Sequence, residues 1–178
     1  TFLGACKEAL GRRSDGSTFP VELNLTEARL DKRLLVAIAR DITERKRAEE
    51  ALNKIRASLE KSQEIAHLGS WELDLRNNSL FWSDEAYRIF GLQPREFGAT
   101  YEAFIAAVHP DDREAVDAAY SGSVREGRDT YEIEHRVVRK STGEVRFVHE
   151  KCEHFRDESG RIIRSVGMVH DITKRKRA

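Results

Sequence analysis

The phrase DITERKRA at residues 41–48 returns as DITKRKRA at residues 171–178, and this repeat decides how the rest of the chain is divided. Each copy follows an apolar, strand-like run, residues 34–39 before the first copy and residues 165–169 before the second. Each copy also opens a charged stretch without Gly or Pro, which favours a helix. Because the copies lie one compact domain apart, the spacing indicates a module strung in tandem, in which a strand ends and a helix leaves.

Composition narrows the function classes. The chain has 178 residues with 31 basic and 31 acidic side chains, so no net charge argues for nucleic acid or for an anionic membrane. No run approaches the roughly 18 apolar residues that a membrane span needs. Cys6 and Cys152 lie far apart without metal-ligand spacing, which is typical of bystander thiols in a reducing compartment. We expect a cytoplasmic piece of a longer protein, with no metal and no membrane contact of its own.

Residues 1–43 predict strands without the helices that would cover them. The sequence SDGS at 14–17 is a turn phrase, and apolar and polar residues then alternate over residues 19–25. A second turn is expected at 30–33, before the strand at 34–39. The segment therefore resembles the back half of a domain, and its apolar face would need a partner such as another copy.

The stretch from residue 44 to 66 predicts a long linker helix, for which Thr43 is the expected N-cap. Its apolar residues recur at spacings of three and four, as in the seam of a coiled coil. The seam residues expected in a dimer are Ala48, Leu52, Ile55 and Leu59. The alternative is an amphipathic helix that lies on its own domain.

Residues 67–173 predict one complete α+β domain, with a single antiparallel sheet and its helices gathered on one side. Ser83 is the expected N-cap of a short helix that Gly91 ends. The expected elements, in chain order, are strands at 71–75 and 80–82, helices at 84–90, 101–108 and 111–127, and strands at 130–139, 144–155 and 162–172.

At this point the motifs match a known family. They are GSWELD at 69–74, WSD at 82–84, VHPDDR at 108–113, EHRVV at 134–138 and the DIT phrase itself. Together they resemble the PAS domain, the sensor module of bacterial signalling proteins. The resemblance implies a five-stranded antiparallel sheet with short helices on one side, and a second, half PAS domain at 1–43. It also assigns residues 44–66 to a signalling helix and residues 174–178 to the start of an outgoing helix.

The resemblance also implies a pocket and a relay. The terminal DIT phrase would join the last strand to the outgoing helix, with the Thr hydroxyl capping the helix and the Asp bracing the strand end. The relay residues are Asp41, Thr43, Asp171 and Thr173, and the alternative is ordinary capping with no role in signalling. The pocket candidates are Tyr87, Phe90, Phe104, Ile105, Tyr120, Val124, Ile133, His135 and Val148.

The cofactor stays unknown, and none is required. Haem is not expected, because the helix at 111–127 contains no histidine and His135 fits a core or pocket-rim histidine better than an axial ligand. Flavin-cysteinyl chemistry is not expected either, since residues 91–108 contain no cysteine. The adjacent acids Asp111 and Asp112 are explained by a helix start.

The pattern indicates a sensory or relay segment rather than an enzyme. It would sense a small ligand, or relay a conformational change, through the helices of a homodimer to an output domain in the same chain. That output would be a histidine kinase of a two-component system or a diguanylate cyclase. The basic run at 174–177 is interpreted as a solvated helix start and not as a nucleic-acid site. The alternatives are a purely structural dimerisation or spacer module and a sensor that carries haem or flavin.

Overall fold

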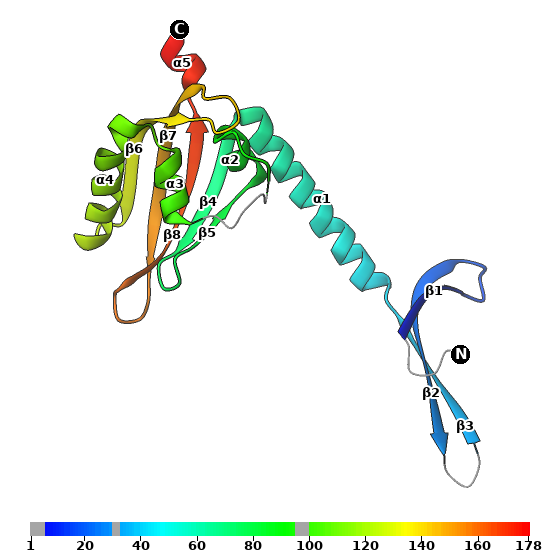
Figure 1. The fold of residues 1–178 in the computed structure, drawn as a ribbon. Coiled ribbons are helices and arrows are strands. Elements are labelled where there is room, and N and C mark those ends of the chain that lie inside the picture. The colour runs from blue at the N-terminus through cyan, green and yellow to red at the C-terminus, as the bar shows by residue number, and fades with distance from the viewer. Residues whose placement is uncertain (1–5, 30–32, 95–99) are drawn as a thin grey trace. The chain divides into compact units, whose positions relative to one another are not determined.

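Figure 1 shows the computed structural model, which describes residues 6–29, 33–94 and 100–178. The chain divides into two compact units, Thr1–Ala57 and Ser58–Ala178. The turn expected at 30–33 falls largely outside the described residues.

The first unit contains a three-stranded antiparallel sheet. Its strands, in the order β1-β2-β3, are β1 (Cys6–Arg12), β2 (Thr18–Arg29) and β3 (Arg33–Asp41). The turn between β1 and β2 forms as predicted: Gly16 has a φ of 88°, and the Asp15 carboxylate accepts hydrogen bonds from Ser17. The sequence did not predict β1, because its small and charged residues carry no alternation. Its residues are held in a strand by antiparallel pairing with β2, from Cys6 opposite Asn24 to Arg12 opposite Thr18.

Helix α1 (Thr43–Ala66) has no buried residue. Leu52 and Ile55 are each 66% exposed, and Leu59 is 58% exposed. No part of the chain that the structure describes therefore covers the predicted seam. Thr43 was expected to be the N-cap, but it is the first helical residue, and its backbone N–H donates to the Asp41 carboxylate. The carboxylate satisfies one of the N–H groups that every helix start leaves without an intrahelical partner.

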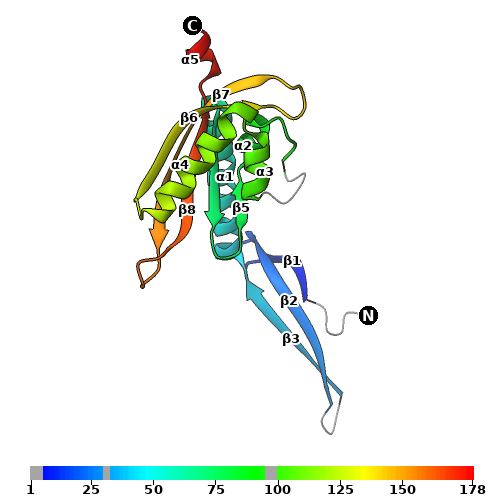
Figure 2. The ribbon, with the colours of Figure 1, turned by 60° about the vertical axis from the view of Figure 1, so that its left-hand side comes forward.

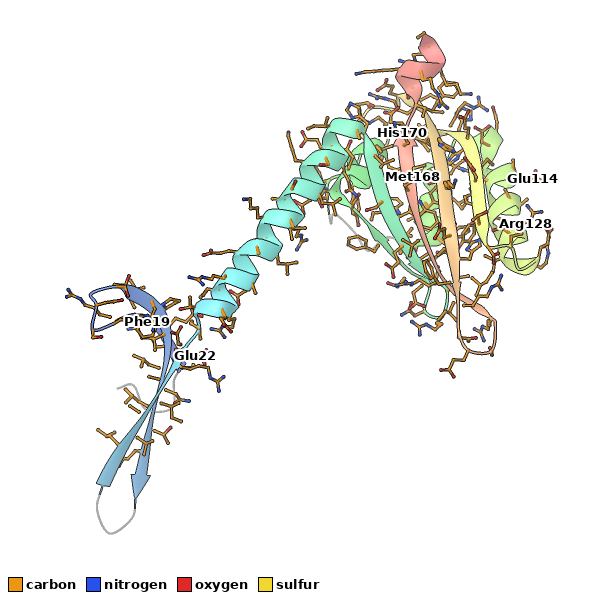
Figure 3. All side chains as sticks on the ribbon, turned by 180° about the vertical axis from the view of Figure 1, so that it is seen from behind. Phe19, Glu22, Glu114, Arg128, Met168 and His170 are labelled. Carbon is orange, nitrogen blue, oxygen red and sulfur yellow. The ribbon has the colours of Figure 1, made fainter. Side chains whose placement is uncertain are left out.

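The second unit is built on a five-stranded antiparallel sheet in the order β5-β4-β8-β7-β6. Its strands are β4 (Leu68–Asp74), β5 (Ser79–Trp82), β6 (Thr130–Val138), β7 (Val145–Arg156) and β8 (Ile162–Asp171). One face carries the core, and the other face carries side chains such as Met168 and His170 (Figure 3). The predicted α+β class and its single antiparallel sheet are confirmed.

Three helices cover one face of this sheet, as Figure 2 shows. They are α2 (Asp84–Ile89), α3 (Tyr101–Ala107) and α4 (Arg113–Arg125), and α5 (Thr173–Arg177) leaves after β8. Ser83 caps α2 as predicted, since its side chain accepts the Ala86 N–H. Gly91 has a φ of 72°, a backbone conformation that glycine adopts without strain and that ends the helix.

The acids Asp111 and Asp112 lie immediately before the long helix, and Asp112 is its N-cap residue. Residues Pro110–Asp112 form a short 3₁₀ turn named η1, and α4 begins at Arg113 without a side-chain cap. The Asp112 carboxylate instead binds the guanidinium of Arg136 on β6 through both oxygens, at 2.6 and 2.9 Å, and also accepts the Arg136 backbone N–H. Hydrogen bonds from Arg136 lower the pKa of Asp112 to about 2. The predicted helix start is therefore confirmed for Asp112, and its carboxylate has a second role that was not predicted, because it anchors the start of α4 to the sheet.

Two glycines allow close packing in the core. A Cβ on Gly167 of β8 would lie 2.7 Å from the Trp71 ring, and a Cβ on Gly69 would lie 2.6 Å from the Ala86 backbone. Trp71 and helix α2 therefore pack directly on the sheet backbone. Among the described residues, no helix combines the length and the apolar character needed to cross a bilayer.

Candidate functional site

A small cavity lies on the helix-covered face of the five-stranded sheet. It is lined by residues of β4, β5, α3, α4 and β7: Trp71, Leu73, Leu80, Trp82, Tyr101, Phe104, Tyr120 and Glu150. About 20 Å³ is open to the centre of a water-sized sphere, which is room for about one water molecule. A larger ligand would have to displace part of the wall.

Aromatic rings form most of the wall and contact one another. The Tyr101 and Tyr120 rings lie 5.2 Å apart between centroids, and the Tyr101 and Phe104 rings lie 6.0 Å apart. Trp71 meets Tyr120 edge-on at 6.5 Å. Rings in edge-on and tilted arrangements stabilise one another beyond simple burial, so these contacts favour the observed packing of the wall.

Glu150 is the only acidic side chain in the lining, which contains no basic one. It lies on β7, is 3% exposed, and its side chain forms no hydrogen bond or ion pair with any of the described residues. Because burial penalises the ionised form, the pKa of Glu150 rises to about 8. The carboxyl group therefore carries a proton at neutral pH unless a ligand changes its surroundings.

The structure places the predicted pocket residues in two groups. Phe104 and Tyr120 line the cavity. The others do not line it: Tyr87, Phe90, Val148 and His135 are buried, and Ile105, Val124 and Ile133 are partly buried against the hydrophobic core.

His135 is buried on β6 with its ring edge toward Phe104, at 6.0 Å between centroids. Neither ring nitrogen has a hydrogen-bond partner in the described part of the chain. Burial lowers the pKa of His135 to about 4, so the ring is neutral at physiological pH. The cavity lining contains no histidine and no cysteine, so it offers neither an axial ligand for haem nor a thiol for a flavin adduct.

Sequence reasoning missed Glu150 as a member of the site. A usable signal existed, because side chains alternate along a strand and Val148 was already placed inward. The same alternation leads from Val148 to Glu150, Cys152 and His154, all of which are buried.

A second missed feature is a buried hydrogen-bond chain that begins at the cavity wall. The Tyr120 hydroxyl contacts the Ser165 hydroxyl at 2.8 Å, and Ser165 contacts Nδ1 of His154 at 2.7 Å. Nε2 of His154 then contacts Ser123 at 2.9 Å. Burial, followed by the charge of Arg156, lowers the pKa of His154. The chain ties α4 to β7 and β8, and it contains no exposed nucleophile.

The DIT phrase at 171–173 joins three elements. The Asp171 carboxylate accepts the Thr173 N–H at 2.9 Å and binds the Arg146 guanidinium at 2.8 Å. The Thr173 hydroxyl accepts the backbone N–H of Phe147 on β7 at 3.0 Å. Burial opposes ionisation of Asp171, but hydrogen bonds from Thr173 and Arg146 leave its pKa lowered. Asp171 therefore braces the strand end as expected, through Arg146 of β7, and it also caps α5. The expected cap by the Thr173 hydroxyl was wrong, because that hydroxyl accepts the N–H of Phe147 on β7.

The first copy, at 41–43, binds differently for a local reason. The Ile42 N–H donates to the Pro20 carbonyl, as the Ile172 N–H donates to the Phe147 carbonyl. Pro20 thus occupies the place of Phe147, and proline has no N–H to offer. The Thr43 hydroxyl donates to Asp41 at 2.6 Å. The two phrases share a sequence, but only the second is bonded through its hydroxyl to a strand N–H.

The described residues contain no group of three or more His, Cys, Asp or Glu side chains that could hold a metal ion. Comparison with protein families shows a match to the model described as "PAS fold" over residues 79–169, and a match to "PAS domain" over residues 4–44. The chain belongs to the PAS domain family. The predicted family and the predicted fold are confirmed.

Similar proteins are sensors. A methyl sulfide methyltransferase-associated sensor of Methanosarcina acetivorans is 41% identical over 88 residues, which cover 49% of this chain and 9% of that protein. The sensor protein FixL of Bradyrhizobium diazoefficiens is 31% identical over 109 residues, which cover 61% of this chain and 21% of that protein. This PAS chain therefore spans less than a quarter of the length of either relative.

Among solved structures, a sensory box histidine kinase/response regulator from Burkholderia thailandensis is 29% identical, with a TM-score of 0.56. The match covers 67% of this chain and 87% of that chain. A diguanylate cyclase with a PAS/PAC sensor from Marinobacter aquaeolei shares the fold at 17% identity, with a TM-score of 0.56. Together with the family match, these relatives show that the PAS segment is a sensory module of signal transduction.

Proposed function

We propose that the complete PAS domain senses a small ligand, or takes up a conformational change, and relays it to the outgoing helix. The observation that supports this is the position of β7 between cavity and helix. Glu150 of β7 lines the cavity, and Phe147 of the same strand donates its N–H to Thr173 at the start of α5. A ligand that shifts β7 would therefore change the anchorage of α5, provided that it binds the two arrangements with different affinity.

The relay requires two chains, and α1 supplies the surface. We propose a homodimer in which Ala48, Leu52, Ile55 and Leu59 form the seam of a two-stranded coiled coil. The seam is exposed in the described residues, and its spacing of three and four suits knobs-into-holes packing. Accordingly, we divide the chain into a half PAS domain at 1–43, a signalling helix at 44–66, a complete PAS domain at 67–173 and the start of an outgoing helix at 174–178.

The output would lie in the same protein. Relatives and structural neighbours include histidine kinases and a diguanylate cyclase, and a domain of either class would receive the movement of α5 in the cytoplasm. In this proposal the segment itself performs no catalysis.

The seam is tested by the mass of the protein in solution. Leu52→Asp together with Leu59→Asp places two charges in the proposed seam and should convert a dimer into a monomer. The matched control is Asn53→Asp with Ala57→Asp, which adds the same charge to exposed positions of α1 outside the seam. Analytical ultracentrifugation should give a dimer for the wild type and for the control. A dimer that persists in the Leu52/Leu59 variant would remove α1 from the interface.

A second function is favoured by the size of the cavity. Room for about one water molecule is what a spacer module filled by its own side chains would have. Native mass spectrometry of gently purified protein, followed by the same sample denatured, separates the two proposals. Additional non-covalent mass on a dimer supports the sensor, and a visible absorption band with it would indicate haem or flavin. A dimer with no added mass supports the spacer.

A further inference from the structure

The PAS cavity combines a buried carboxyl group with an aromatic wall, and this combination selects a class of ligand. We propose that the cavity binds a small organic cation, a protonated amine or a quaternary ammonium, with Glu150 as its counter-ion. The proposal rests on the ligand-sensing function above and names the chemistry that such a ligand would have.

Glu150 is the first observation. Its side chain is 97% buried at the cavity wall, although burying a carboxyl group without a partner costs free energy. It has no hydrogen bond or ion pair within the described residues, so the fold itself does not compensate that cost. A cation in the cavity would supply the missing partner.

The rings of the wall are the second observation. Trp71, Trp82, Tyr101, Phe104 and Tyr120 come from β4, β5, α3 and α4, and all five line the same small space as Glu150. Aromatic faces attract ammonium groups through the ring quadrupole, and several rings around one site form the cage that recognises quaternary ammonium ions. The cage and the carboxylate therefore favour the same charge.

The lining also discriminates against other ligands. It contains no Lys, Arg or His, so an anionic ligand would find no cationic side chain to pair with. A purely apolar ligand would leave the carboxyl group unpaired and would displace the water that can reach it.

One side chain of the lining, Tyr101, is placed so that it could move to admit a larger ligand. Tyr101 is the least buried of the five aromatic side chains, and its hydroxyl is held by a 3.0 Å hydrogen bond to the exposed Asp117. A ligand larger than water would be accommodated by movement of the Tyr101 ring at this exposed side.

Cation binding should release a proton. Glu150 is protonated at neutral pH, and a bound cation favours its ionised form. The titratable groups that interact with Glu150 are Tyr101 on α3, Tyr131 on β6 and Cys152 on β7, and burial raises the pKa of all three, so they stay neutral. Affinity for a cation of fixed charge should therefore rise about tenfold per pH unit below pH 8 and level off above it.

The test is isothermal titration calorimetry of the whole chain with three pairs of probes, each a cation and a neutral molecule of similar shape. The pairs are methylammonium with methanol, tert-butylammonium with tert-butanol, and choline with 3,3-dimethylbutan-1-ol. We expect at least one cation to bind ten or more times more tightly than its neutral counterpart. Glu150→Gln should abolish this preference. Glu132→Gln, which changes an exposed carboxylate on the other face of the sheet, should preserve it.

Each outcome is decisive. Equal binding of a cation and its neutral counterpart, or a preference that survives in Glu150→Gln, overturns the cation proposal and leaves the ligand sensor standing. Binding of none of the six probes also overturns it, while the dimer seam is judged separately by the mass of the Leu52/Leu59 variant. If Glu150→Gln does not fold, the wild type decides alone, because cation affinity that does not rise between pH 6 and pH 8 contradicts the role of Glu150.

Discussion

Thr173→Val tests the bond that links β7 to the outgoing helix. Valine has the shape of threonine but no hydroxyl, and Thr173 is only 4% exposed, so packing is preserved while the bond to the Phe147 N–H is lost. The Phe147 carbonyl keeps its bond from the Ile172 N–H. The substitution therefore leaves one backbone donor without its partner.

The expected loss in the free energy of unfolding depends on how deeply the Phe147 N–H is buried. Leaving a buried donor unpaired costs about 1–3 kcal/mol, and because the Phe147 N–H is only partly buried we expect about 1–2 kcal/mol. For a domain of this size that loss lowers the melting temperature by roughly 4–8 °C.

The assay uses the two tryptophans of the chain, Trp71 and Trp82, which both lie in the complete PAS domain. Urea unfolding followed by their fluorescence reports this domain alone. Thr142→Val is the control, because the Thr142 hydroxyl accepts a 3.3 Å bond from the Glu144 N–H in an exposed turn. A surface change of this kind should alter the free energy of unfolding by less than about 0.5 kcal/mol.

A loss in Thr173→Val no larger than that in Thr142→Val would refute the reasoning. Hydrogen exchange gives a second reading, since amides at the start of α5 should exchange faster in Thr173→Val if the hydroxyl holds the helix to the strand. Unchanged exchange there, even with a loss of stability, would mean that the bond stabilises β7 without anchoring α5.

Three further substitutions test the core of the PAS domain, each by urea unfolding. Asp112→Asn should cost about 1–3 kcal/mol at pH 7 by breaking the bidentate pair with Arg136; as pH falls from about 4 to about 2 the wild type should lose this stabilisation, because the Asp112 pKa is lowered in the fold, so the two proteins should converge. The wild type should lose stability relative to His135→Leu as pH falls from about 6.5 to about 4. The pKa of His135 is lowered in the fold, so in that range only the unfolded wild-type chain takes up the proton. Gly167→Ala should cost about 1–3 kcal/mol, because its Cβ would overlap the backbone carbonyl oxygen of Lys151 and would also lie 2.7 Å from the Trp71 ring.

Local signals predicted most of the second unit. Ser83 and Gly91 mark the two ends of α2 in the sequence, and the structure has both, because capping and positive φ depend on neighbouring backbone. Strand β1 was missed, since its residues show no alternation and its pairing partner on β2 supplies the order. Pairing between two strands depends on residues far apart in the chain, so the pattern within one strand does not predict it.

The functional contacts were predicted less well for the same reason. Asp112 looked like a helix start, yet its partner Arg136 lies 24 residues away on a different element. His154 and Glu150 are two residues of the helix-covered face that alternation along β7 would have placed inward, but nothing in the sequence tells that one is hydrogen-bonded and the other unpaired. Burial can be inferred from period two, whereas satisfaction of a polar group depends on what the opposite layer offers.

The two DIT phrases have the same three residues but different hydrogen bonds. Both aspartates accept the N–H of the first helical residue, so capping is a property of the phrase itself. The bond from threonine to the neighbouring strand depends on a residue outside the phrase, an N–H at Phe147 that Pro20 lacks. The proposed strand-to-helix relay through threonine has a hydrogen bond to act through at Thr173, whereas at Thr43 the neighbouring Pro20 offers no donor.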